Sequence, residues 1–344
     1  MRRTQTTIAA AVAWCAVAWT AAPSYAQDAG EPKAEGHEEH EHERPVDESP
    51  PGHVHDDHGD ALYADRNAFI ERDYPEPFLF SLTSAWFDPW PHRHFNRRGA
   101  PFTHVFGLEP AFLDRDLFID YRQIEGEDET EQEIEVEVEW AITRRIGLVI
   151  EAPFIFLNPD PGSREEGFGD MAVAARFLLV DTSRFLMSLN VEVEAPTGSE
   201  KRGLGSGETL ISPTLSFWVD LGEWVAWNAQ IGSEHGTKSG EDEVLYKMAL
   251  TYSVLGPALF DEDHGDEHEH VGRHFPVGLI NFIAEVSGKT SLSGRSRGET
   301  TADFTFGITY LLTVNIEVRA GVQFPLLKPR EFDNGYLFSL VYHF

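Results

Sequence analysis

The chain has 344 residues, and its 58 acidic residues outnumber its 27 basic ones, which gives a formal net charge of −31. This length suits one large domain or two ordinary ones. A surface this acidic repels phosphate backbones, so the composition excludes nucleic-acid binding as the main function and favours solubility, attraction of cations or repulsion from anionic surfaces. The only cysteine, Cys15, lies in the N-terminal apolar run, so a chain without that run has no disulfide and no cysteine-ligated metal.

The N-terminus has the three parts of a secretory signal sequence. Arg2 and Arg3 precede an apolar run from about Ile8 to Ala22, and Ser24-Tyr25-Ala26 places small residues at the −3 and −1 positions. Residues 1–26 are therefore predicted to be a signal peptide. A membrane anchor is the alternative, and the shortness of the run argues against it.

Residues 27–65 are rich in Glu, Asp, His, Pro and Gly, and we expect them to be disordered because they cannot bury a core. They contain one of two clusters of histidines and acidic residues, and the other lies in the connection 256–276. Neutral imidazoles spaced two to four residues apart among carboxylates suit weak, divalent transition-metal binding by Zn, Cu, Ni or Co, with a solvated linker as the alternative. No other cofactor is expected. The predicted metal ligands are His37, His40, His42, His53, His55, His58, His264, His268, His270 and His274.

Residues 66–113 form a transitional segment that is rich in aromatic residues and prolines and has no regular period. Three roles remain open for it: a plug for the domain that follows, a lead-in on its periplasmic side, or a source of extra strands.

From residue 114 to 344 the sequence alternates between apolar and polar residues in short segments separated by turn signals, which predicts β-strands. The clearest is 131–142, where Ile134, Val136, Val138 and Trp140 share one face and four glutamates share the other. The predicted strands are 115–124, 131–142, 145–154, 169–179, 184–195, 208–220, 223–232, 243–254, 277–287, 301–311, 313–324 and 334–344.

An even number of strands with one strongly apolar face predicts an all-β fold, an antiparallel transmembrane β-barrel of about 12 strands. A soluble β-sandwich with one exposed face is the alternative, and the large apolar residues on so many strands argue against it. Short connections such as 143–145, 181–183 and 221–223 alternate with long ones, which places the short turns in the periplasm of a Gram-negative-type bacterium. The long connection 256–276 is the exception, because parity puts it on the periplasmic side, together with the first histidine cluster.

The other face of these strands is mostly acidic. An acidic lumen would favour cations, whereas a fully ion-paired interior would close the pore, and both interpretations remain open. No catalytic arrangement emerges, so we do not expect an enzyme. The predicted lumen residues are Asp120, Arg122, Glu133, Glu135, Glu137, Glu139, Glu151, Arg176, Glu192, Glu194, Lys247, Glu317 and Arg319.

Two short motifs stand out in residues 108–344, Gly167-Phe168-Gly169-Asp170 and Ala195-Pro196-Thr197-Gly198. With these motifs as its most specific pieces, the region resembles the outer-membrane barrels of the "MetA-pathway of phenol degradation" family, often labelled as transporters. The resemblance implies an outer-membrane barrel that passes small molecules, and the histidine-rich N-terminal segment is an addition to the family pattern. The terminal Phe344 also resembles the C-terminal signal that barrel-assembly machinery reads.

These patterns together predict a channel or transporter for small solutes in the cell outer membrane, with a cation-leaning lumen. The alternative is a periplasm-facing metal-binding barrel involved in metal handling. The expected partners are outer-membrane lipid, a small-molecule or cation solute and the assembly machinery, and the sequence gives no oligomeric state.

Overall fold

The computed structural model describes residues 82, 83, 86, 90, 93–96, 99–222, 224–254, 277–294 and 296–344. The predicted signal peptide, residues 27–65 and the histidine-rich part of the connection 256–276 lie outside these residues. No helix in the described residues is long and apolar enough to cross a membrane.

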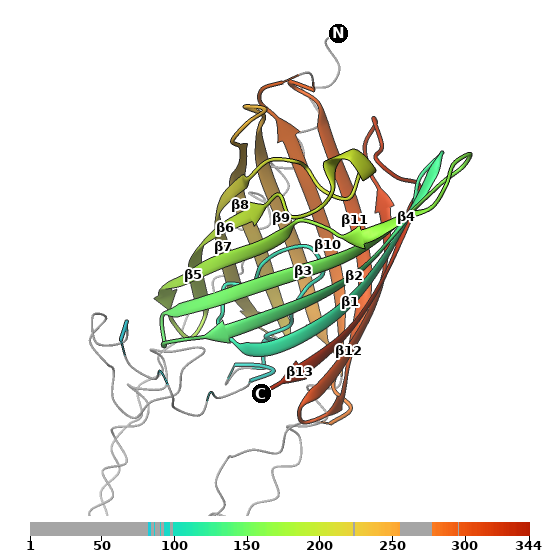
Figure 1. Ribbon diagram of the computed structural model, residues 1–344. Helices are drawn as coiled ribbons and strands as arrows, with labels where there is room; N and C mark the ends of the chain where they lie inside the picture. The colour runs from blue at the N-terminus through green and yellow to red at the C-terminus, as the bar shows by residue number, and fades with distance from the viewer. Residues whose placement is uncertain are drawn as a thin grey trace, which may run out of the picture. The chain divides into compact units, whose positions relative to one another are not determined.

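The described part of the chain is a closed antiparallel β-barrel of 12 strands, as predicted (Figure 1). The first strand pairs with both the second and the last, and β2 also pairs with β3, so the sheet has no open edge in the ring. The short β4 pairs only with β3 and stands outside the ring. The strands are β1 (Arg115–Glu125), β2 (Glu129–Ala141), β3 (Ile146–Pro159), β4 (Glu165–Phe168), β5 (Met171–Asp181), β6 (Phe185–Ala195), β7 (Leu210–Gly222), β8 (Val225–Gly236), β9 (Asp242–Ser253), β10 (Ile280–Ser291), β11 (Thr300–Thr313), β12 (Ile316–Pro325) and β13 (Asn334–His343).

Alternation along each strand gives the barrel an apolar outer face. On β2, Ile134, Val136 and Trp140 are 40%, 41% and 39% exposed, and Phe338 on β13 is 54% exposed. Side chains this large and apolar are unfavourable in water when they form a continuous surface. In hydrocarbon they are favourable, and a closed barrel satisfies every backbone group there.

The two ends of the barrel differ. At one end most connections are tight turns, such as 142–145 between β2 and β3 and 314–315 between β11 and β12, and the connection from β9 to β10 is the long exception; we call this the short-turn end. At the other, the long-loop end, β6 and β7 are joined by residues 196–209, which include the 3-10 helix η1 (Glu200–Arg202). Both β4 and η1 belong to this end, and neither was predicted from the sequence.

The chain before β1 lies inside the barrel, where Figure 1 shows it crossing the interior. We call residues 93–96 and 99–114 the lumenal segment. Phe102 packs against Trp218 of β7 with the rings tilted by 33° and their centroids 4.6 Å apart, and the Trp218 Nε1–H donates to the Pro101 carbonyl at 2.9 Å. Phe112 and Leu113 complete this buried apolar core, which therefore belongs jointly to the lumenal segment and the wall.

Small residues on the inner face make room for the segment. A Cβ on Gly307 of β11 would lie 2.2 Å from the Phe106 ring, and one on Gly321 of β12 would lie 3.0 Å from it. A side chain at Gly307 would therefore displace Phe106. Glycine at these two positions of the wall therefore leaves the space that the Phe106 ring occupies.

Candidate functional site

The candidate site is the interior of the barrel, which can be followed from the long-loop end to the short-turn end. The predicted lumen residues alternate along their strands with the exposed apolar side chains, so they lie on the inner face. Several of them meet. Arg122 pairs with Glu131 at 3.0 Å and Glu133 at 3.1 Å, while Asp120, Glu135 and Glu137 gather within 4.8 Å of one another.

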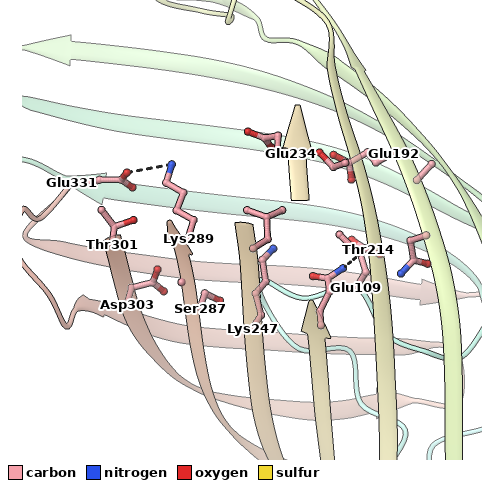
Figure 2. A pocket seen from close by; sticks show the side chains of 16 residues that line it. Glu109, Glu192, Thr214, Glu234, Lys247, Ser287, Lys289, Thr301, Asp303 and Glu331 are labelled. Atoms are coloured by element: carbon pink, nitrogen blue, oxygen red, sulfur yellow. Dashed lines mark hydrogen bonds and ion pairs between the residues drawn. The ribbon is translucent and has the colours of Figure 1, made fainter. Parts of the chain in front are cut away.

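A cavity of about 300 Å³ opens inside the barrel between the long loops and the lumenal segment. Its lining includes five carboxylates and two lysines, and Figure 2 shows them directed into one space. Lys289 is paired with Glu331 at 3.2 Å and lies 3.7 Å from Glu243. With five carboxylates against two lysines, the lining of the cavity has a net negative formal charge. Its charged lining residues are Glu109, Glu192, Glu234, Lys247, Lys289, Asp303 and Glu331.

The floor of the cavity is the lumenal segment, which polar contacts bind to the wall. Glu285 of β10 accepts backbone N–H groups from Phe106 and Gly107, each at 3.0 Å. Lys247 of β9 donates to the Gly107 carbonyl, and Glu109 forms an ion pair with Arg176 of β5. The segment is thus held from several strands at once.

Two arginines predicted to face the lumen complete this attachment. Arg319 of β12 donates to the Val105 carbonyl and to Asp120, both at 3.2 Å. Arg176 also pairs with Glu139 at 2.8 Å. These arginines bridge wall carboxylates and the segment, a role that the strand pattern alone did not indicate.

A buried cluster of histidines and carboxylates lies nearer the short-turn end. His104 Nε2 is 3.2 Å from Asp116 and 3.8 Å from Asp114, and the other oxygen of Asp116 is 2.9 Å from His343 Nδ1. Burial alone would lower the pKa of His104, but the hydrogen bonds and charges of Asp114 and Asp116 outweigh it and raise the pKa to about 9. His104 is therefore a cation at neutral pH, held between wall and segment.

Sequence reasoning did not identify this cluster. The inward positions of Asp116 and His343 follow from strand alternation, but their contact depends on the closing register that pairs the first strand with the last. His94 and His104 lie in the segment to which no element was assigned. The ten histidines predicted as metal ligands lie outside the described residues, so that hypothesis stays a prediction.

No protein-family model and no curated protein matches the chain. Solved structures do. An outer membrane channel from Pseudomonas putida F1 aligns with 70% of this chain and 100% of its own, at 13% identity and a TM-score of 0.51. The NanC porin (10% identity, 67% of this chain, 98% of its own) and the KdgM porin in complex with disordered oligogalacturonate (12%, 66%, 99%) each give a TM-score of 0.42.

The similarity to the channel from Pseudomonas putida F1 is a similarity of fold, and it agrees with the closed ring and the apolar outer face. The phenol-degradation family resemblance is not tested by these matches and stays a prediction. The chain has the fold of an outer-membrane β-barrel, and its apolar outer face fits it to that membrane.

Proposed function

We propose that the protein is an outer-membrane channel for small solutes whose lumen favours cations. The observation that carries the proposal is the net negative cavity inside the barrel, whose lining has five carboxylates and two lysines. Field lines from such a lining are focused by the low-dielectric walls, which raises the local concentration of cations and lowers that of anions.

The lumenal segment bears on how such a channel conducts. Its contacts with Glu285, Lys247 and Arg319 occupy the interior below the cavity, so a solute that enters from the long-loop end meets Glu109 and Gly107 next. Passage of anything larger than a small ion then requires the segment to shift. The polar anchors at residues 105–107 are suited to that, because each of them can be exchanged for water, whereas the apolar core around Phe102 and Phe112 holds the rest of the segment.

The test is the reversal potential of the refolded protein in a planar bilayer under a KCl gradient. We expect cation selectivity, and we expect the triple variant Glu192→Gln, Glu234→Gln, Asp303→Asn to lose most of it. The matched control neutralises three carboxylates of the long-loop end that lie outside the cavity lining, Glu165, Glu200 and Glu241. Anion selectivity, or an equal loss of selectivity in the control, would count against the acidic cavity as its source.

A second candidate is metal handling by the histidine clusters. Ten of the 15 histidines fall within two short stretches rich in carboxylates, a pattern suited to weak, pH-dependent binding of divalent transition metals. Replacing all ten with asparagine should abolish weak, multi-site Zn²⁺ binding and leave the current unchanged. If weak binding is unchanged after this replacement, the clusters are not the ligands.

A further inference from the structure

Three ligand-type side chains converge beside the His104 cluster, near the short-turn end. His94 of the lumenal segment, Glu317 of β12 and His343 of β13 each place one nitrogen or oxygen atom within 4.8 Å of the others. Their side chains belong to residues that are 5%, 4% and 1% exposed. The rings of His94 and His343 meet edge to face, with centroids 5.4 Å apart.

Glu317 is the unusual member. In the portion of the chain that the structure describes, its carboxylate forms no hydrogen bond and no ion pair. An ionised carboxylate without compensation is strongly unfavourable at such burial. A cation placed between it and the two imidazoles would supply that compensation.

His343 has the support that a metal-binding histidine usually has. Its Nδ1 is 2.9 Å from Asp116, which is itself 0% exposed and 3.2 Å from His104. Histidines that bind metals commonly donate the second ring N–H to a carboxylate, which fixes the tautomer and the ring orientation. With the proton on Nδ1, Nε2 of His343 carries the lone pair that a metal ion needs.

We propose that His94, Glu317 and His343 form a binding site for a divalent transition metal, best matched by Zn²⁺. Two imidazoles and one carboxylate are an established zinc donor set that leaves a fourth position for water. The absence of sulfur in the set disfavours Cu(I), and its two imidazoles disfavour Ca²⁺ and Mg²⁺.

This site is separate from the predicted ten-histidine clusters and does not depend on cation conduction. It joins the lumenal segment, through His94, to the last two strands. A bound ion would therefore hold the segment to the wall.

The test is Zn²⁺ binding by the full chain in a background where the ten clustered histidines are asparagine. We expect about one Zn²⁺ per chain, a higher unfolding temperature with Zn²⁺ because only the folded state contains the site, and an X-ray absorption signature of two imidazoles. Failure to bind Zn²⁺ in this background would overturn the proposal.

Single substitutions then identify the ligands. His94→Asn and Glu317→Gln should each weaken Zn²⁺ binding at least about 100-fold, and Asp116→Asn should weaken it about 10- to 100-fold. The control is His235→Asn, because His235 also contacts a carboxylate, Asp242 at 2.8 Å, but is exposed at the long-loop end. Unchanged affinity in both ligand variants would refute the assignment. His94 lies outside the barrel strands, so His94→Asn decides the question if Glu317→Gln does not fold.

Discussion

Glu285→Gln should weaken the attachment of the lumenal segment to the wall and let it open more often. The Glu285 carboxylate is 1% exposed and accepts the N–H of Phe106 with one oxygen and that of Gly107 with the other. Glutamine keeps one acceptor and replaces the other with an NH₂ donor, so both bonds lose their charge assistance and the Gly107 N–H keeps at most its longer contact, 3.3 Å, with the retained oxygen. Together these cost about 2–4 kcal/mol.

Release can be measured as the rate of thiol labelling at a cysteine in the segment. Thr103 is 1% exposed, so Thr103→Cys should react only when the segment opens. A loss of about 2–4 kcal/mol corresponds to labelling about 30- to 1,000-fold faster in Glu285→Gln. The control is a cysteine at Ser296 in the loop between β10 and β11, whose labelling should not change. A change below about threefold at residue 103 would refute Glu285 as an anchor.

Three further predictions concern the barrel. The pKa of His104 in the folded protein, about 9, exceeds the ordinary value of 6.5, so its ion pairs contribute fully to stability below pH 6.5 and are lost as the pH rises through 9. The free energy of unfolding in urea should therefore fall across that range by on the order of 3 kcal/mol, and His104→Gln should make it nearly independent of pH there. Val136→Arg, on the outer face, should cost about 2–4 kcal/mol in bilayer refolding titrations, and Arg at the exposed loop position 296 should cost almost nothing. Deleting Phe344, whose ring lies 5.5 Å from that of Trp140, should lower the heat-modifiable, assembled fraction in membranes, and Phe344→Tyr should restore it.

The barrel could be predicted because its signal is local. On β2 the period-two pattern of Ile134, Val136 and Trp140 assigns the strand and both of its faces without knowledge of its neighbours. β4 was missed because its four residues, Glu165–Phe168, are too few to show a period. It forms because β3 continues past Glu151, where its pairing with β5 ends, and β4 pairs with the edge that is left.

The contents of the lumen could not be predicted in the same way. The segment before β1 has no repeating pattern, and it is ordered by partners far along the chain, such as Glu285 for Phe106 and Trp218 for Pro101. The residues of the acidic inner face could be predicted from alternation along the strands. The roles of Arg176 and Arg319 as bridges to the segment could not, because they depend on contacts that alternation does not encode. His343 showed no partner in the sequence because Asp116, its partner, is 227 residues away.

Contacts between residues this far apart in the sequence affect the order in which the barrel folds. The contacts that fill the interior join residues 179 positions apart for Phe106 and Glu285, 214 for Arg319 and Val105, and 227 for Asp116 and His343. Loops of this length close slowly, because their entropy must be lost before the contact stabilises anything. The hairpins can therefore form while the first and last strands are still apart, and the interior network can be completed only when β1 and β13 meet. A chain that lacks its final strand would also lack His343, the partner of Asp116. The like charges of Asp114, Asp116 and Glu139 would then be opposed by fewer partners, so truncated chains should have low stability at neutral pH.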